Sequence, residues 1–405
     1  MSAHVSKPDI VICGAGPVGL TAALKLANHG ISSHILEKRS TLSQASKAST
    51  FHPPTLEILA EFGLLDVMLS QGCKAERIQY RGTGGNILAE FDQAVLQRDT
   101  IAPYRIHLEQ SAVTPHLLEK ALATDLVRIS FDADVTETGQ DDNHVWARTS
   151  DGQTVSGAYL LGTDGARSAV RQSLGLEQTG HVYPGRVLRL IVAKSFGELM
   201  PDMAPVSYIF SQDKRSVSLL EMPDCWRIII RIPPGASDEE VKDPAWYRPI
   251  VDEFLPQCST DLEILGTDVY GASKMLCDTN AVGRIGLLGD AVHLTNTRGG
   301  MNMNCGFHDA YAVADAIIDA MNHGKSEKFH EVLQERLRIA RDVLLPRTDK
   351  NVTGKDDWLT FIADAASNRV KARAYLLTSS MLDMAPERLS HPERFSNPER
   401  LSNKV

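Results

Sequence analysis

Long apolar runs are missing from this sequence of 405 residues. None approaches the roughly 20 apolar residues that a membrane-spanning helix needs. The first eight residues are polar and lack the apolar core of a secretory signal peptide. The six cysteines are scattered without the CxxC spacing of zinc or redox sites, so we expect reduced thiols. Together these absences predict a cytoplasmic protein.

Excess positive charge is also absent, since 42 lysines and arginines face 51 aspartates and glutamates, for a net charge of −9. This balance argues against nucleic acid as a partner, because nucleic-acid binding requires basic surfaces. Hydrophobic residues make up 43% of the chain, which is enough for a sizeable core. The length favours about two to three domains. We therefore expect a globular enzyme that acts on small molecules.

A glycine-rich turn near the N-terminus is the first motif. An apolar run at residues 9–13 precedes the sequence GAGPVG at 14–19, and a helical pattern follows at 20–27. This order of strand, turn and helix is typical of a dinucleotide-binding site. Glu37 ends a second apolar run, roughly 20 residues on, where an acidic side chain accepts hydrogen bonds from a ribose.

Each glycine of this turn has its own expected role. Gly14 allows the tight turn, Gly16 lets the backbone approach a pyrophosphate, and Gly19 lets the helix pack on the strand. The helix N-terminus then presents free N–H groups and the positive end of its dipole to the phosphates. A glycine turn in another kind of α/β protein is the alternative, and the motif alone does not separate FAD from NAD.

Two later apolar segments end in aspartate. Asp164 follows the run at 159–162 and Asp290 follows the run at 285–289, with glycine beside each aspartate. Both should lie at the carboxyl ends of strands, where open α/β sheets bind their ligands. An ordinary Asp-Gly turn is the alternative for either residue.

Together these motifs resemble those of the single-component FAD-dependent aromatic hydroxylases. The segment 159–171 is similar to the DG motif of that family, 283–293 to its GD motif, and 46–59 to the stretch after its second strand. The resemblance covers residues from about 8 to about 345. It implies that FAD is the cofactor, that Asp290 binds ribityl or ribose hydroxyls, and that Asp164 lies near the FAD and the nicotinamide path.

The resemblance also implies the fold class: α/β, with a Rossmann-like FAD-binding domain, an interleaved α+β substrate domain with an antiparallel sheet, and a helical C-terminal region. Strand-like runs between residues 189 and 232 fit such a sheet, and segment 75–110 should add strands to it. Gln110 matches a family glutamine that contacts the flavin. We expect FAD-binding segments at 1–75, 106–180 and 276–345, substrate-domain segments at 76–105 and 181–275, and C-terminal helices with a repeat tail at 346–405.

The tail repeats Pro-Glu-Arg three times from residue 386 onward. It is expected either to be solvated or to form a subunit contact or lid.

Two segments depart from the family pattern. Lys47 stands where the family has arginine, and it supplies charge without the bidentate fork. In the flavin loop, which we define as residues 294–304, Thr297 replaces a proline and Met301 with Asn302 replaces Gln-Gly. The glycine pair at 299–300 and the helix start remain, so flavin binding is still expected. The expected cofactor-binding residues are Gly14, Ala15, Gly16, Pro17, Val18, Gly19, Glu37, Lys38, Lys47, Gln110, Asp164, Gly289, Asp290, Gly300, Met301 and Asn302.

The chemistry of the family defines the remaining candidates. Its members reduce FAD with NADH or NADPH, add O2 at the flavin C4a carbon, and transfer the terminal oxygen of that hydroperoxide to an electron-rich ring. Deprotonating a ring hydroxyl makes the ring more electron-rich, so the site needs a base or relay and a dry cavity. The polar candidates for catalysis and substrate binding are His52, His107, Tyr208, His293 and Arg298.

Each candidate also has an alternative. His52 and His107 could be surface histidines, His293 could make a structural hydrogen bond, and Arg298 could be an exposed loop residue. The side of its strand to which the Tyr208 side chain points is left open.

These observations predict an FAD-dependent monooxygenase that hydroxylates a small phenolic or hydroxypyridine-type aromatic compound with NADH or NADPH and O2. We expect a monomer or homodimer with no metal and no nucleic-acid or membrane partner. One alternative is an oxidoreductase of the same fold that does not insert oxygen. Another is a flavin-binding regulatory protein without turnover.

Overall fold

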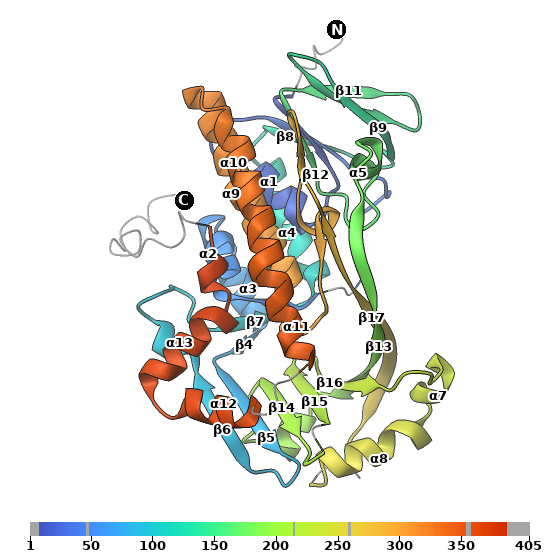
Figure 1. Ribbon diagram of the computed structural model, residues 1–405, viewed down its shortest axis with the longest axis vertical. Coiled ribbons are helices and arrows are strands. Elements are labelled where there is room, and N and C mark those ends of the chain that lie inside the picture. Colours follow the sequence, from blue (N-terminus) through green and yellow to red (C-terminus); the bar gives the residue numbers. More distant parts are fainter. Residues whose placement is uncertain (1–7, 46–47, 214, 258–260, 354–357, 387–405) are drawn as a thin grey trace.

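The computed structural model describes residues 8–45, 48–213, 215–257, 261–353 and 358–386, with the backbone alone at 351–353 (Figure 1). Predictions for Lys47, for Cys258 and for the repeat tail beyond Pro386 lie outside the described residues. The fold is built on two large sheets, one in the upper and one in the lower half of Figure 1.

The first sheet has six strands in the order β18-β19-β12-β1-β2-β8, and its neighbours are parallel except for the pair β18 and β19. Strand β1 is buried at all of its positions, as expected for the centre of a parallel sheet covered on both faces. The strands are β1 (Ile10–Cys13), β2 (Ser33–Leu36), β8 (Val127–Ser130), β12 (Tyr159–Gly162), β18 (Ala281–Val282) and β19 (Ile285–Leu287).

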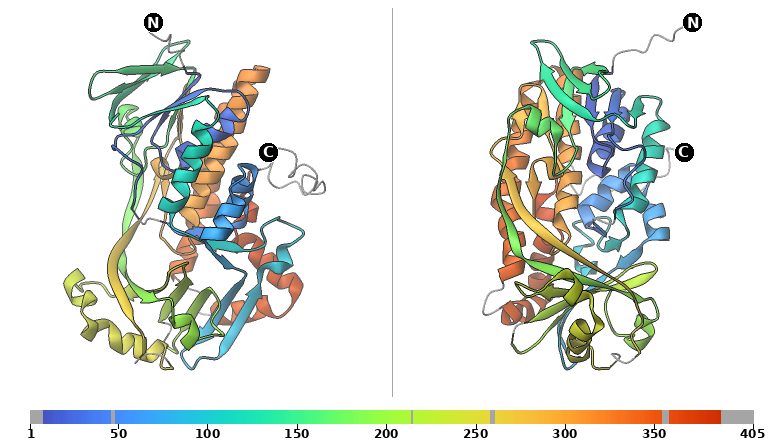
Figure 2. Two further views of the ribbon diagram at one scale, coloured as in Figure 1. Left: turned by 180° about the vertical axis from the view of Figure 1, so that it is seen from behind. Right: turned by 90° about the vertical axis from the view of Figure 1, so that its right-hand side faces the viewer.

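Helices cover one face of this sheet. Helix α1 (Pro17–Ala27) packs against α4 (Gln110–Leu122) and α9 (Met301–His323), and the three lie side by side in Figures 1 and 2. A small antiparallel sheet of β9 (Val135–Gln140), β10 (Val145–Thr149) and β11 (Thr154–Gly157) lies on the other face. The apolar core between them includes Val11, Leu160 and Val145. The central strands are therefore covered on both faces, and a cavity lies at the carboxyl ends of the strands.

The second sheet has eight strands in the order β20-β17-β13-β16-β15-β14-β5-β6. The expected antiparallel meander is present, and one pairing departs from it, because β14 runs parallel to β5. The chain reaches β5 long before β14, so no hairpin constrains their direction. The strands are β5 (Arg77–Gly82), β6 (Ile87–Asp92), β13 (Gln178–Ala193), β14 (Val206–Phe210), β15 (Ser216–Glu221), β16 (Cys225–Ile232), β17 (Ile264–Cys277) and β20 (His293–Leu294).

Strands β13 and β17 pair along most of their length and run from the lower half of the molecule to the upper half (Figure 1). They carry the chain between the two sheets, so the sheets share a rigid connection. The fourth sheet consists of β3 (Thr50–Phe51), β7 (Arg105–His107) and β4 (Cys73–Ala75), and these strands come directly before and after β5 and β6 in the chain. The shorter helices are α2 (Pro53–Glu61), α3 (Leu65–Gln71), α5 (Ala169–Ser173), α6 (Phe196–Leu199), α7 (Asp238–Lys242) and α8 (Pro244–Phe254).

The C-terminal region is helical, as expected from its sequence. Helix α10 (Glu327–Ile339) continues through a π-helical turn at Ala340–Leu344 into α11 (Leu345–Thr353). Helices α12 (Trp358–Ala366) and α13 (Arg369–Ser379) pack on the second sheet beside β5 and β6 (Figure 1). Within the described ranges, no helix combines the length and the apolar character that crossing a membrane would require.

Candidate active site

A cavity of about 1480 Å³ is lined by residues of both large sheets and of the C-terminal helices. Its wall extends from the glycine turn at 14–18 to helix α13. Pockets for a drug-sized ligand measure roughly 300–1,000 Å³, so this cavity has room for a cofactor and a second ligand.

The glycine turn lies at the end of the cavity formed by the first sheet. Gly14 has a φ of +105°, and a Cβ atom there would lie 2.7 Å from the carbonyl oxygen of Thr163. A Cβ atom on Gly19 would collide with the carbonyl of Gly14, whereas one on Gly16 would meet no atom of a described residue within 4 Å. Among the described residues, no side chain caps the N-terminus of α1. Gly16 and the helix N-terminus thus leave open space with free donors, which suits a pyrophosphate.

Glu37, at the end of β2, is held by the turn itself. Its Oε2 atom accepts a hydrogen bond from the Ala15 N–H at 2.9 Å, and its Oε1 atom accepts one from the Arg39 N–H at 3.1 Å. The side chain is buried and lines the cavity, while Lys38 lies on the exposed rim beside it. The carboxylate is therefore fixed where an adenosine ribose would meet it.

Asp164, after β12, has one satisfied and one unsatisfied oxygen. Its Oδ2 atom accepts hydrogen bonds from the N–H groups of Ala169 and Val170 at 2.7 and 3.2 Å. Its Oδ1 atom is buried without a partner among the described residues, and burial raises the pKa of the carboxyl. A buried acceptor of this kind on a cavity wall fits a hydroxyl or N–H group of a ligand.

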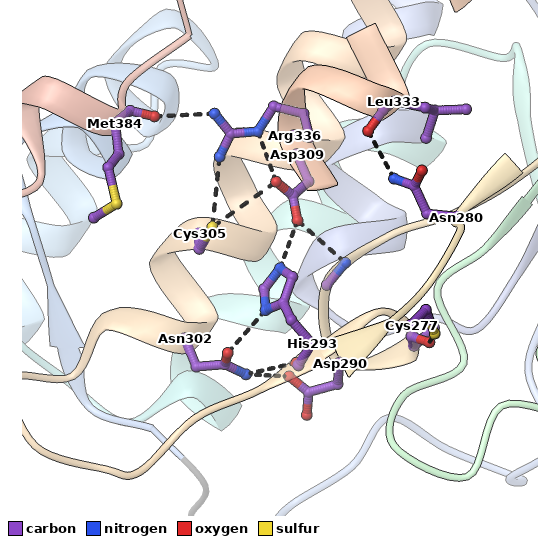
Figure 3. Close-up of polar contacts among 12 residues, drawn as sticks. Cys277, Asn280, Asp290, His293, Asn302, Cys305, Asp309, Leu333, Arg336 and Met384 are labelled. Atoms are coloured by element: carbon purple, nitrogen blue, oxygen red, sulfur yellow. Dashed lines mark hydrogen bonds and ion pairs between the residues drawn. The ribbon is translucent and has the colours of Figure 1, made fainter. Parts of the chain in front are cut away.

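Asp290 lies in a short 3₁₀ turn after β19, next to Gly289, and also lines the cavity. Its Oδ1 atom accepts a hydrogen bond from the side-chain amide of Asn302 at 2.8 Å (Figure 3). Asn302 is in the first turn of α9 and contacts His293 behind it, through its Oδ1 atom, at 2.9 Å. The GD motif and the flavin loop are thus joined through side chains.

The flavin loop forms the central part of the cavity wall. Gly299 and Gly300 have φ values of +82° and +62°, which favour glycine, and a Cβ atom on Gly300 would lie 2.9 Å from Thr50. Asn296 donates a hydrogen bond to the carbonyl of Thr348 in α11 at 2.8 Å. Further residues predicted for the cofactor line the same cavity: Ala15, Pro17, Val18, Gln110, Met301 and Asn302.

Of the five catalytic candidates, Tyr208 and Arg298 line the cavity. His52, His107 and His293 are buried behind the wall. A surface position for His52 and His107 is wrong, because the pairing of β3 with β7 places both histidines in the interior. Their rings contact the carbonyls of Gly299 and Glu221, each at 2.7 Å. Burial lowers the pKa of His107 to about 4 and holds that of His52 well below 6.5, so both rings are neutral.

Several cavity residues carry no sequence motif and were not predicted. Arg105 lies in β7, Tyr80 in β5, Arg227 in β16 and Tyr375 in α13, and all line the cavity. The Arg227 guanidinium pairs with Glu109 and donates to Ser49 at 2.9 Å. The Tyr80 and Tyr375 hydroxyls are 2.7 Å apart. Only the fold brings these side chains together.

The residues of the first half of the cavity fit FAD. Glu37 and Asp290 place carboxylates at the wall that would accept hydrogen bonds from sugar or ribityl hydroxyls, Asp164 has an unsatisfied buried oxygen, and the N-terminus of α1 suits a pyrophosphate.

Comparison with known proteins agrees with this geometry. A family model described as an FAD binding domain matches residues 7–345. This chain belongs to the FAD-dependent aromatic hydroxylases.

Among its relatives, para-nitrophenol 4-monooxygenase of Pseudomonas sp. strain WBC-3 is 29% identical over 395 residues, covering 92% of this chain and 96% of the relative. The 6-hydroxy-3-succinoylpyridine 3-monooxygenase HspB of Pseudomonas putida is 27% identical over 370 residues, covering 87% and 92%. The crystal structure of p-nitrophenol 4-monooxygenase PnpA from Pseudomonas putida has a TM-score of 0.83 at 26% identity, covering 95% and 98% of the chains.

As a member of the aromatic hydroxylases, the protein is an FAD-dependent monooxygenase, with NADH or NADPH as the co-substrate typical of the family. The expected fold class and cofactor are confirmed. The alternative of an oxidoreductase that does not insert oxygen is not supported. A small aromatic substrate and O2 are the reactants.

Proposed function

We propose that this hydroxylase acts on a small phenol or hydroxypyridine that binds as an anion beside Arg105. The observation that carries the proposal is the isolation of this arginine. It is 4% exposed, and no carboxylate of a described residue lies within ion-pair distance. Burying a charge without a counter-ion is costly, so an anionic ligand at this position would stabilise the site.

The other hydrogen bonds of Arg105 leave it available to a ligand. One terminal nitrogen donates to the carbonyl oxygen of Ser379 at 3.0 Å, and the Nε–H group has no partner among the described residues. By contrast, Arg189 and Arg227 in the same cavity are paired with Asp268 and Glu109. Arg105 is thus the cavity arginine best suited to a phenolate or a charged ring substituent.

Tyrosine rings form the wall around this position. Tyr208 stacks on Tyr80 with ring centroids 5.2 Å apart, and Tyr80 contacts the hydroxyl of Tyr375. Burial raises the pKa of Tyr375 to about 12 and that of Tyr80 above its usual value, so both phenols stay protonated. A protonated pair can donate one hydrogen bond to a ring oxygen, and the flat walls select an aromatic substrate.

These residues have a direct role in the reaction. The flavin supplies the reducing and oxygen-transfer chemistry when bound. Arg105 lowers the pKa of a ring hydroxyl by stabilising its anion, which enriches the ring in electrons. The buried tyrosines orient that oxygen, and the apolar wall excludes water. The relatives named for nitrophenol and for a hydroxypyridine act on compounds of this kind.

We also propose that Arg298 holds a second polar group of the substrate. It lines the cavity from the flavin loop and is only partly buried, and its backbone N–H donates to Asn296 at 3.0 Å. A cytoplasmic location is proposed as well, because the five cysteines in the described ranges are free thiols.

The test uses a panel of phenols and hydroxypyridines, with 4-nitrophenol as the probe. Stimulated NAD(P)H oxidation and incorporation of an atom from labelled O2 identify turnover. Arg105→Met should weaken binding of the phenolate about 10–150-fold, because a hydrogen bond to a charged group is worth about 1.5–3 kcal/mol. Arg105→Lys should retain the positive charge and therefore lose less affinity for the phenolate than Arg105→Met. FAD content must be equal in each variant.

The absorbance of bound 4-nitrophenol provides a readout of its ionisation. Wild-type enzyme should bind the phenolate form at a pH where the free compound is protonated, and Arg105→Met should not. Unchanged affinity and unchanged ionisation in Arg105→Met would refute the role of Arg105. Arg298→Lys and Arg298→Ala should weaken the binding of substrates that carry a second polar substituent; unchanged affinity in both would place Arg298 in solvent.

A further inference from the structure

The histidine of the GD motif, His293, lies behind the cofactor site and is 1% exposed. It is the centre of a buried polar cluster that also contains Asn302, Cys305, Asp309 and Arg336 (Figure 3). Both ring nitrogens have partners: Nδ1 lies 2.9 Å from Asn302 Oδ1, and Nε2 lies 2.8 Å from Asp309 Oδ2.

The orientation of the Asn302 amide determines what His293 must donate. Its Nδ2 group lies 2.8 Å from Asp290 Oδ1 and 3.4 Å from the carbonyl of His293, and both are acceptors. The amide nitrogen therefore faces these acceptors, and the amide oxygen faces the imidazole. Both ring nitrogens of His293 thus point at acceptors, and only the imidazolium form has a proton for each.

We infer that His293 is a buried imidazolium and a positioning residue, which orients Asn302 so that its amide holds the Asp290 carboxylate for FAD. The cation does not touch the cavity. It acts through the Asn302 side chain on the Asp290 carboxylate, and Asp290 lines the cofactor site.

The surroundings of His293 support a positive charge. Burial lowers the pKa of His293, but the nearby Cys305 and Asp309 raise it by more, so the pKa lies well above its usual value of 6.5. Arg336 donates to the other oxygen of Asp309 at 2.7 Å, and Cys277 on β17 is a further titratable group facing the ring. Arg171 and Cys277 both donate to the carbonyl of Ala291, at 3.1 and 3.5 Å.

A metal ion is the competing interpretation of His293, Cys305 and Asp309, whose ligand atoms lie within 4.8 Å of one another. The Arg336 guanidinium already donates to Asp309 and to the Cys305 sulfur, at 2.7 and 3.5 Å. A second cation would be repelled at that position, so the geometry favours a hydrogen-bonded network.

The proton has a consequence for FAD binding. When pH rises through the pKa of His293, the imidazole keeps one N–H group, which stays on the nitrogen that faces the Asp309 carboxylate, because a carboxylate is a stronger acceptor than an amide oxygen. Asn302 then loses the donor that fixes its amide, and a turned amide would place its oxygen against Asp290. FAD affinity should therefore be level at neutral pH and fall at alkaline pH.

The first experiment measures the ring directly. Protein with ¹⁵N-labelled histidine is examined by NMR at about pH 8, and His293→Gln assigns the signal. We expect both ring nitrogens of His293 to be protonated, while the rings of His107 and His308 are neutral. A neutral His293 ring at this pH overturns the inference.

The second experiment measures FAD affinity from the quenching of flavin fluorescence between about pH 6 and about pH 10. His293→Gln should weaken FAD binding about tenfold or more and remove its alkaline decline. His308→Gln is the matched control, since His308 is a buried histidine on α9, the helix that also carries Asn302, but its ring contacts Thr55 instead of Asn302. It should keep the affinity and the pH profile of the wild type.

A double variant separates positioning from a general loss of structure. If His293 acts through Asn302, then His293→Gln combined with Asn302→Ala should bind FAD no more weakly than Asn302→Ala alone. Additive losses, or wild-type affinity in His293→Gln, would show that His293 serves only the packing of α9.

Discussion

The hydroxyl groups of Tyr80 and Tyr375 lie 2.7 Å apart and join strand β5 to helix α13. This contact makes a C-terminal helix part of the substrate cavity, close to Arg105. Residues that are nearly 300 positions apart in the chain thus contribute to one binding wall.

Tyr375→Phe should raise the KM for the aromatic substrate and leave the affinity for FAD unchanged. The variant leaves the buried hydroxyl of Tyr80 without its partner, which costs about 1–3 kcal/mol of stability. Steady-state kinetics and urea unfolding measure the two effects. Tyr104→Phe, at a buried tyrosine outside the cavity lining, is the control and should not change KM. An unchanged KM in Tyr375→Phe would remove this pair from the substrate wall.

Loss of either cofactor carboxylate should weaken FAD binding. Glu37→Ala and Asp290→Ala each remove an acceptor for cofactor hydroxyls, and a hydrogen bond to a charged group is worth about 1.5–3 kcal/mol, or roughly 10–150-fold in affinity. Glu37→Gln is the milder test, because Glu37 also accepts from the Ala15 N–H group of the glycine turn. Fluorescence titration with FAD measures the change. Both assignments fail if the two alanine variants bind FAD like the wild type.

Aromatic substrate should accelerate reduction of the bound flavin by NAD(P)H. The sequence has one dinucleotide-binding motif, at 14–19, and we expect FAD to occupy it, so that the nicotinamide would reach the flavin only transiently. Substrate shares the cavity with the flavin loop and can gate this step. Anaerobic stopped-flow reduction should be on the order of tenfold faster with substrate, a change of about 1.4 kcal/mol in the barrier. Equal rates with a substrate that is hydroxylated would refute gating.

Glu57 on α2 should make the protein less stable as pH rises. Burial raises its pKa from 4.5 to about 7, against hydrogen bonds from Thr100 and Ile101 that lower it. The folded state therefore favours the protonated form. The resulting stability is fully present below about pH 4.5 and is lost as pH rises through about 7, with an upper limit of about 3 kcal/mol.

Urea unfolding at about pH 5 and about pH 8 tests this prediction. Glu57→Gln should be more stable than the wild type at the higher pH and should show a smaller difference between the two conditions. Glu61→Gln, on the same helix and paired with Lys25 in the wild type, should keep the full difference. The same difference in Glu57→Gln as in the wild type would contradict the prediction.

The cofactor half of the site was predictable because its demands are local. The close approach of Gly14 to Thr163 requires a glycine at a fixed position after a strand. The strand and the glycine are adjacent in the sequence, so the pattern can be recognised there. Asp290 is equally local, since it follows its strand directly. Its partner Asn302 was identified from its place in the flavin loop. The proposed positive charge on His293, which contacts Asn302, could be inferred only from the structure.

The substrate half could not be read in the same way. Arg105 lies in a strand of three residues, and nothing near it in the sequence distinguishes it from a surface arginine. That Arg105 is buried without a carboxylate partner can be seen only in the folded protein, where α13 brings Ser379 and Tyr375 to this part of the cavity. For His52 and His107 the sequence left a surface position open, and the pairing of β3 with β7 excludes it by placing both side chains in the interior.

The order of strands in the second sheet has a consequence for how the chain folds. Strands β5 and β6 are made early, yet their neighbour β14 follows more than 100 residues later, and β20 closes the opposite edge near residue 294. Neither large sheet can be completed until most of the chain has been synthesised and has left the ribosome. Nascent β5 and β6 therefore carry an unpaired edge through much of translation, and slow, chaperone-sensitive folding is the expected result.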